Sequence, residues 1–161
     1  MKNALGVSLG ICALVYTYLA LSVITVIGAT AIWAGFIAWG SYFTVGKDAL
    51  TKNISANIFG AVLAGVAVLI HSQIGMAGDF AWPIAVGITV WALTLVPSLG
   101  NAPANVFGYA ATFGFMLLSG LADTAAVTSL AVSNPIVTMT IAMVVGSIFG
   151  LASEKLAAKL G

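Results

Sequence analysis

The sequence contains no arginine, one cysteine, one histidine and very few charged residues of either sign. Charged residues make up 6% of its 161 positions, whereas a soluble domain carries about 25%. Nucleic-acid binding is excluded as a function, because it requires clusters of Lys and Arg that this chain lacks. A surface with so few charges is not built to face water. The composition therefore predicts an integral membrane protein whose first partner is the lipid bilayer.

The residues that catalysis and metal binding require are also scarce. Cys12 is the only cysteine, so no intramolecular disulfide can form, and with His71 it supplies too few ligands for a structural zinc ion. The sequence has no nucleophile–base pair and no phosphate-binding loop. We therefore expect no enzymatic activity, no catalytic residue, no cofactor and no bound metal.

Long apolar runs dominate the chain, which is 61% hydrophobic with a mean hydropathy of +1.16. Polar residues separate six runs, and each should be helical because lipid offers no partner to backbone N–H and C=O groups. The first run follows Lys2 but is long enough to span a bilayer, so we expect a helix there and not a cleaved signal. The expected fold class is all-α, a polytopic membrane helical bundle of about six transmembrane helices that forms one domain over residues 1–161. The runs cover residues 4–26, 29–46, 54–73, 80–97, 103–120 and 135–157.

Residues typical of helix starts mark several of these runs. Asn53 and Ser55 are predicted to cap the third run, because short polar side chains accept hydrogen bonds from free N–H groups. Pro103 suits the first turn of the fifth run, and Asn134 followed by Pro135 suits the start of the last run.

The charged residues divide between the two sides of the predicted bundle. With the N-terminus in the cytoplasm, every lysine lies on the cytoplasmic side, while Asp79 and Asp123 lie outside. This distribution follows the positive-inside rule. Five spans would place the C-terminal lysines outside, so we predict six spans with both termini cytoplasmic. The lysines are Lys2, Lys47, Lys52, Lys155 and Lys159.

Two stretches of the chain are nearly identical. Residues 55–60 read SANIFG, and residues 103–108, 48 positions later, read PANVFG. Each stretch opens a predicted helix, the third and the fifth, so the repeating unit is a hairpin of helices two and three, then of helices four and five. A unit of two spans returns the chain to the same side, and the two copies are therefore parallel. In repeat-built membrane proteins, sites commonly lie where the repeats meet.

Asn57 and Asn105 occupy matching positions of this repeat, about one turn into their helices. An amide without partners is costly in hydrocarbon, so we expect both to face the bundle interior or a wet cavity. There an amide, which both donates and accepts hydrogen bonds, suits a neutral polar solute or water. The alternative is structural, with Asn serving as a cap and the Phe-Gly pairs serving as packing residues.

Other polar and aromatic residues are candidates for the same pathway or for the outer face. Phe59 and Phe107 beside the amides would form a constriction or pack in the core. His71 would act as an external pH sensor or proton relay, or serve as an interfacial anchor. Asp79 and Asp123 would bias an outer vestibule towards cations, or serve as solvated loop ends. The pathway candidates are Asn57, Asn105, Phe59, Phe107, Trp39, Trp91, Asn53 and Asn101, and the outer-face candidates are His71, Asp79 and Asp123. Residues 121–132 are too few to span a bilayer and predict either a surface helix or a re-entrant half-helix.

Tyrosines and glycines in the first and last runs predict close helix packing. Tyr16 and Tyr18 lie mid-span in the first run, so their hydroxyls should find partners inside the bundle. The GxxxG pairs allow helices to approach closely, within one chain or between copies, and we expect a homo-oligomer through Gly-rich helix faces. These pairs are Gly6 with Gly10 and Gly146 with Gly150.

Several short motifs carry a family resemblance over most of the chain. They are Trp33-Ala34-Gly35-Phe36, Tyr42-Phe43 with Gly46, the stretch from Pro103 to Phe113, and the region around Gly150. Through them the chain resembles the YcdZ-like bacterial inner-membrane proteins, a family described only as a domain of unknown function. The resemblance implies a small polytopic protein of the bacterial inner membrane and assigns no binding or catalytic residue.

The interior of the predicted spans lacks Asp, Glu, Lys and Arg, which ion-coupled pumps and carriers generally keep there. We therefore expect a passive channel or facilitator for a small neutral solute, among urea-like amides, water and dissolved gases. The alternative function is that of a non-transporting accessory or scaffold protein of the membrane. An ion-coupled small-molecule carrier is a third possibility, which the missing charges disfavour.

Overall fold

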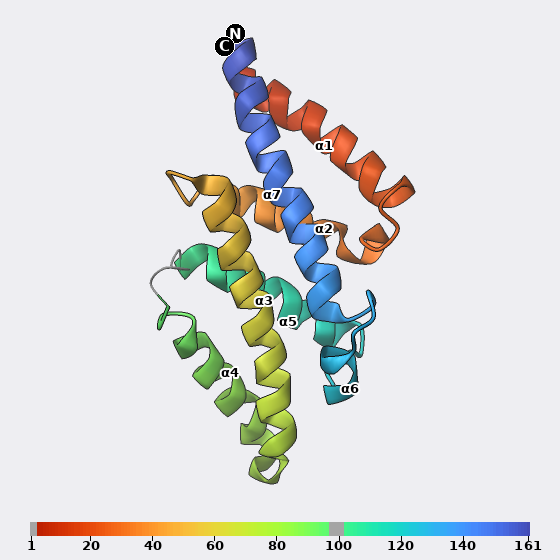
Figure 1. Ribbon diagram of the computed structural model, residues 1–161, viewed down its shortest axis with the longest axis vertical. Coiled ribbons are helices and arrows are strands. Elements are labelled where there is room, and N and C mark those ends of the chain that lie inside the picture. Colours follow the sequence, from red (N-terminus) through yellow and green to blue (C-terminus); the bar gives the residue numbers. More distant parts are fainter. Residues whose placement is uncertain (1–2, 97–101) are drawn as a thin grey trace.

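The computed structural model describes residues 3–96 and 102–161, and every regular element in these ranges is a helix. Figure 1 shows the helices, most of them coloured and labelled in chain order. They are α1 (Ala4–Ser22), α2 (Gly28–Tyr42), α3 (Ala49–Gln73), the 3₁₀ helix η1 (Gly75–Phe80), α4 (Ala81–Ala92), α5 (Ala102–Leu118), α6 (Thr124–Thr128) and α7 (Pro135–Leu160).

Each of the six predicted apolar runs corresponds to one α-helix, although α3 begins five residues before its run, and these helices differ in length. In the described part of the chain, α1, α3 and α7, with 19, 25 and 26 residues, are long and apolar enough to cross a membrane. The others are shorter, at 15 residues for α2, 12 for α4 and 17 for α5. At 1.5 Å per residue α4 is about 18 Å long, below the roughly 30 Å of a hydrocarbon core. The all-helical prediction is thus confirmed, with three helices of spanning length.

Helix α7 begins where the sequence predicts. The side chain of Asn134 accepts a hydrogen bond of 2.8 Å from the backbone N–H of Ile136, and Pro135 occupies the first turn. Proline is suited to this position because a first-turn N–H has no partner within the helix. Pro103 likewise lies in the first turn of α5.

The prediction that Asn53 and Ser55 cap α3 is wrong. The helix begins four residues before Asn53, at Ala49, and the N-cap position belongs to Asp48, whose side chain makes no capping bond. Ser55 instead donates back to the carbonyl of Thr51, one turn earlier in the same helix. Asn53 is fully buried inside α3, and its amide nitrogen donates hydrogen bonds to α2 and α7. These bonds satisfy the amide, so it does not cap a helix start.

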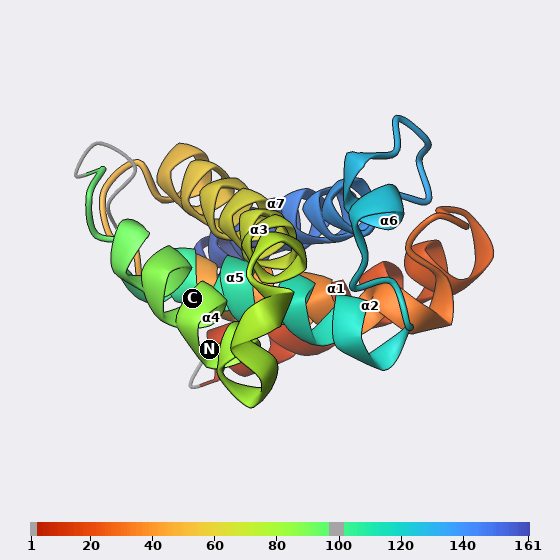
Figure 2. The ribbon, with the colours of Figure 1, turned by 90° about the horizontal axis from the view of Figure 1, so that it is seen from below.

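The chain ends lie together at one end of the bundle, as Figure 1 shows. In Figure 1 the loop between α2 and α3 lies at the left and the loop after α1 at the right, both in the half that carries the chain ends, whereas the turn after α3 lies at the opposite end. Seen along the other axis, α3 and α7 run side by side above α1, α2, α4 and α5 (Figure 2). We call the side that carries both chain ends the terminal face.

Glycines allow the closest helix contacts in this bundle. A Cβ atom on Gly60 of α3 would overlap the carbonyl oxygen of Asn105, and one on Gly108 of α5 would lie 2.6 Å from the Cα of Asn57. Helices α3 and α5 therefore cross backbone against backbone, as small residues permit in membranes. Gly146 of α7 packs in the same way on the backbone of α2.

The two tyrosines of α1 have opposite environments. Tyr16 is fully buried, and its hydroxyl donates a 2.8 Å hydrogen bond to the carbonyl of Ile32, as predicted. Tyr18 is 63% exposed, so the prediction that its hydroxyl finds a partner inside the bundle is wrong. Residues two positions apart on a helix do not share a face, so burial of Tyr16 turns Tyr18 outward.

Candidate functional site

A cluster of buried polar side chains joins three helices. The amide nitrogen of Asn53 on α3 donates to the carbonyl of Ala38 on α2 and to the hydroxyl of Ser147 on α7, both at 2.8 Å. Its amide oxygen accepts from the hydroxyl of Ser41 at 2.6 Å. We call Ser41, Asn53, Asn57 and Ser147 the amide cluster; all four side chains are at most 1% exposed.

Asn57 lies one turn further along α3 and leaves one atom without a partner. Its amide nitrogen donates to the backbone carbonyl of Asn53 at 2.8 Å and to the side-chain oxygen of Asn53 at 3.1 Å. Its own Oδ1 is buried and has no hydrogen-bond partner. Asn57 is thus bound at one end of its amide and has free accepting capacity at the other.

Asn105 on α5 points to a different helix. Its amide nitrogen donates to the carbonyl of Leu93, directly after α4, at 3.1 Å, and its Oδ1 is also buried without a partner. Within the described residues no hydrogen bond joins the side chains of Asn57 and Asn105. The structure brings their backbones together at the α3–α5 crossing, while their amides bond toward separate neighbours.

Thr112 is a buried polar residue that the sequence reasoning missed. It is fully buried on α5, and its hydroxyl has no hydrogen-bond partner. Its spacing of seven residues from Asn105 places both on one helix face, which was the available signal. Between them, the hydroxyl of Tyr109 bonds to that of Thr89 on α4 at 2.9 Å. This face of α5 therefore carries a line of polar groups.

The aromatic candidates do not gather in one place. Trp39 is buried and donates from Nε1 to the hydroxyl of Ser153 at 2.9 Å. Phe59 is half-buried and packs against an apolar cluster formed by α3, α4 and α5, which includes Val68, Ala85 and Met116. Phe107 is 37% exposed. Trp91 is 62% exposed on the outer surface, so it does not line the interior of a single chain. The remaining pathway candidate, Asn101, lies outside the described residues.

The outer-face candidates lie in the last turn of α3, in η1 and at the start of α6. His71 stacks on the ring of Trp82, with ring centroids 3.8 Å apart. Asp79 is exposed in η1. Asp123 accepts a 2.9 Å hydrogen bond from the N–H of Ala126 and so caps α6, a mostly exposed helix of five residues. Residues 121–132 thus contain a short helix at the surface of the bundle, with no long half-helix.

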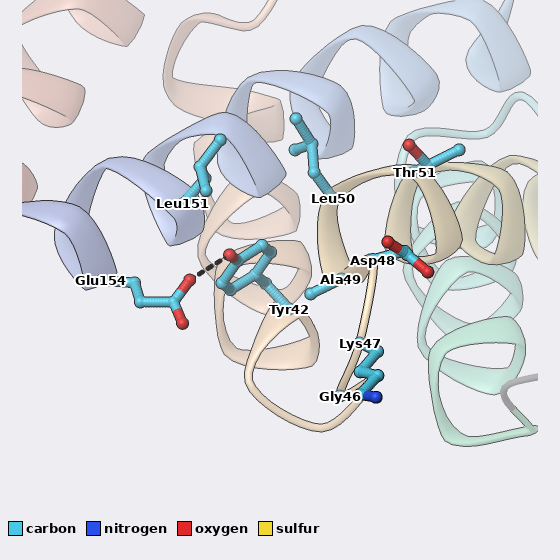
Figure 3. A pocket seen from close by; sticks show the side chains of 9 residues that line it. All are labelled: Tyr42, Gly46, Lys47, Asp48, Ala49, Leu50, Thr51, Leu151 and Glu154. Atoms are coloured by element: carbon cyan, nitrogen blue, oxygen red, sulfur yellow. Dashed lines mark hydrogen bonds between the residues drawn. The ribbon is translucent and has the colours of Figure 1, made fainter.

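A pocket of about 420 Å³ opens at the terminal face between α2, α3 and α7. Tyr42 reaches from α2 toward α7, where its hydroxyl donates to the carboxylate of Glu154 (Figure 3). The turn before α3 carries charges of both signs, and Asp48 in it adopts a left-handed backbone with φ of 56°. We call this the terminal pocket; its lining residues are Tyr42, Gly46, Lys47, Asp48, Ala49, Leu50, Thr51, Leu151 and Glu154.

A metal site is not evident in the part of the chain that the structure describes, since no three His, Cys, Asp or Glu side chains are grouped to hold an ion. The polar groups of the amide cluster and the terminal pocket are amides, hydroxyls, the carboxylates of Asp48 and Glu154, and the ammonium of Lys47. Such groups exchange hydrogen bonds with small polar molecules.

Comparison of the sequence with curated proteins and with solved structures gave no match. A family model described as "Protein of unknown function (DUF1097)" matches residues 6–158, which is nearly the whole chain. The matched range includes all of α2 to α6 and most of α1 and α7, and with them the amide cluster and the terminal pocket. The chain therefore belongs to this family of unknown function, DUF1097.

Proposed function

We propose that the protein is an integral membrane protein through which a small neutral solute crosses passively, as in a channel or facilitator. The observation that carries this proposal is a set of three buried polar atoms without partners among residues 3–96 and 102–161. They are Oδ1 of Asn57, Oδ1 of Asn105 and Oγ1 of Thr112. A buried polar group without a partner costs about 1–3 kcal/mol, and native proteins seldom retain one without a reason.

The chemistry of these atoms supports a particular class of solute. Two are amide oxygens, which only accept hydrogen bonds, and the third is a hydroxyl that can accept. A solute with N–H or O–H donors, such as water or a urea-like amide, would satisfy them. A dissolved gas without donors would not, so among the neutral solutes we favour water and small amides.

The membrane arrangement that goes with this function has six spans with both termini in the cytoplasm. The orientation is supported by Lys155 and Lys159, which lie in the C-terminal part of α7, and by Asp79, which lies in η1 directly after α3. Figure 1 shows the end of α7 and the turn after α3 at opposite ends of the molecule. The short α2 and α4 would cross with help from their flanking turns and from local thinning of the bilayer. Under this proposal α2–α3 and α4–α5 are the parallel repeats, and the reciprocal glycine contacts of α3 and α5 lie where they meet.

A location in the bacterial inner membrane is part of the proposal and rests on the resemblance to YcdZ-like proteins. A homo-oligomer is part of the proposal, because Gly10 of the α1 GxxxG pair has no atom within 4 Å of a built Cβ. That face of α1 is open to a second copy or to lipid. The other pair, Gly146 and Gly150, is used within the chain, against the α2 backbone and the Tyr42 ring.

Stopped-flow light scattering on liposomes that contain the purified protein tests the function. Water, formamide, acetamide, urea and glycerol are compared with protein-free liposomes. We expect faster equilibration for water or a small amide, and slower equilibration when Asn57 and Asn105 are both replaced by Leu. Thr94→Val is the matched control, because the exposed Thr94 hydroxyl bonds only to its own helix turn. Unchanged flux in the double variant would assign the two amides a structural role.

The second candidate function is that of a non-transporting accessory or scaffold protein. The full set of partners around Asn53 favours it, since this amide serves helix association and leaves no atom free. Scattering traces identical to those of protein-free liposomes for every solute would replace the facilitator by this alternative. An ion-coupled carrier is disfavoured, because the buried polar residues of the described chain are all Ser, Thr and Asn.

A further inference from the structure

The terminal pocket and the amide cluster are built on the same three helices. On α2, Ser41 bonds to Asn53, and the next residue, Tyr42, lines the pocket. On α3, Thr51 lines the pocket, and Asn53 follows two residues later. The pocket therefore lies at the end of the bundle that is nearest to the amide cluster.

The ring of Tyr42 lies between the two sites along α7. Ser147 belongs to the amide cluster, and Glu154, seven residues later on the same helix face, belongs to the pocket. Gly150 lies between them, and a Cβ placed on it would be 2.6 Å from Cγ of Tyr42. Tyr42 is only 4% exposed although it lines an open pocket. The ring of Tyr42 therefore packs on α7 at Gly150, between the terminal pocket and the amide cluster.

We propose that the terminal pocket is the first binding site of the solute and that the Tyr42 ring controls passage from it to the amide cluster. This inference rests on the proposed function, because it names the entrance of the same pathway. The Tyr42 hydroxyl donates to the carboxylate of Glu154, which holds the ring across the passage (Figure 3). A solute with N–H or O–H donors competes for that carboxylate, so the binding of such a solute releases the ring.

The pocket chemistry agrees with a neutral solute that both donates and accepts. Glu154 and Asp48 supply accepting carboxylates, while Lys47 and the hydroxyl of Thr51 supply donors. Two carboxylates beside one ammonium disfavour an anion. The solute class is therefore that of small amides and water, the same class that the unpartnered atoms deeper in the bundle favour.

Cysteine accessibility tests the barrier without relying on transport. In a Cys12→Ala background, Ser147→Cys places one thiol in the amide cluster, and Thr51→Cys places one in the pocket. The rate of modification by a small water-soluble methanethiosulfonate is measured in detergent. We expect slow labelling at position 147 with Tyr42. Labelling there should be faster with Tyr42→Phe, which loses the hydroxyl that bonds to Glu154, and fastest with Tyr42→Ala, which also loses the ring. Labelling at position 51 should be fast in every form.

Glu154→Ala provides a second variant, because Glu154 is exposed and its loss is compatible with folding. It should speed labelling at position 147 by at least about tenfold, because a tenfold change corresponds to about 1.4 kcal/mol and a hydrogen bond to a charged group contributes slightly more than this. Acetamide should also speed labelling when Tyr42 and Glu154 are present, and not in Tyr42→Ala. Equal rates at position 147 in all forms, with and without acetamide, would overturn the inference.

The two proposals fail in distinguishable ways. If labelling responds to Tyr42 and acetamide but liposomes show no flux, the barrier is real and the facilitator function is wrong. If liposomes show flux but labelling ignores Tyr42 and Glu154, the solute enters elsewhere and the role of the terminal pocket is wrong.

Discussion

Gly60 of α3 and Gly108 of α5 pack reciprocally, each against the backbone of the other's helix. A Cβ on Gly60 would meet the carbonyl oxygen of Asn105 and lie 2.5 Å from the nitrogen of Tyr109, and a Cβ on Gly108 would meet the carbonyl group of Asn57. The two glycines are the same residue of the two similar stretches, 48 positions apart. The glycine that both stretches share thus has a physical use, because it lets α3 and α5 cross in contact.

Replacement of either crossing glycine by alanine should destabilise the fold. The added methyl group would meet backbone atoms that cannot move away alone, so we expect a loss of about 1–3 kcal/mol for Gly60→Ala and for Gly108→Ala. Gly114→Ala is the matched control in α5, because nothing lies within 4 Å of its built Cβ. Thermal unfolding in detergent, followed by circular dichroism, measures the difference. Equal melting temperatures for Gly108→Ala and Gly114→Ala would contradict the close crossing.

Asn53→Ala should destabilise the fold through the loss of bonds between helices. The side chain makes three such bonds, to Ser41, Ala38 and Ser147, and at about 0.6 kcal/mol for each the loss is about 2 kcal/mol. Ser55→Ala is the control, because that hydroxyl bonds only within its own helix. Detergent-based chemical unfolding compares the two variants. A loss for Asn53→Ala no larger than that for Ser55→Ala would contradict the network.

Thr112→Val should change stability and flux in opposite directions. The substitution replaces a buried hydroxyl without a partner by a methyl group of similar size, so the free energy of unfolding should rise by about 1 kcal/mol. If the hydroxyl binds solute, the equilibration of liposomes should become slower. Both are measured on the same preparation. Greater stability with unchanged flux would remove Thr112 from the pathway.

Cysteine labelling from one side of the membrane should distinguish six spans from three. In the Cys12→Ala background, Thr25→Cys and Met76→Cys should react with an impermeant maleimide added to spheroplasts. Lys47→Cys should react only after permeabilisation. All three positions are exposed in the structure. If only α1, α3 and α7 cross, Thr25 and Lys47 lie on the same side, so a shared labelling pattern for these two would contradict six spans.

Brominated lipids should quench Trp91 and spare Trp39. Trp91 is 62% exposed and Trp39 is 4% exposed, so only the first ring can contact lipid chains. Single-tryptophan variants, in which the other three tryptophans are replaced by Phe, isolate each signal. Fluorescence in brominated and ordinary lipid is compared, with both variants unfolded in detergent as the reference. Stronger quenching of Trp39 than of Trp91 would contradict the helix orientations.

Features of this protein were predictable from the sequence where they depend only on a residue type and on the adjacent backbone. Apolar runs form helices because backbone groups have no other partner in lipid, and all six runs are helical. Asn134 and Pro135 start α7 because a cap and a first-turn proline need only the adjacent backbone. The burial of Asn57 and Asn105 was likewise expected from the cost of exposing an amide to hydrocarbon.

Features that depend on a neighbouring helix were not predictable in this way. Asn53 was predicted to be an N-cap because an amide side chain can bond to the free backbone groups at a helix start. The same side chain can also bond to another helix. Its oxygen accepts from Ser41 and its nitrogen donates to Ser147, so the neighbouring helices decide its role. The exposure of Trp91 and the pocket at Glu154 also depend on where α2, α3 and α7 come together.

The sequence by itself determined that the chain is helical, apolar and poor in interior charge, because these properties follow from residue type and spacing alone. Only the tertiary structure decided which of its glycines lie at crossings: Gly60 and Gly108 meet backbone, while Gly10 and Gly114 meet nothing. The reason is that all glycines have the same side chain, a single hydrogen atom, so the residue type alone does not show which of them lies against another helix. The rotation of each helix about its axis, set by the packing of all its neighbours together, selects the face on which that surface is used.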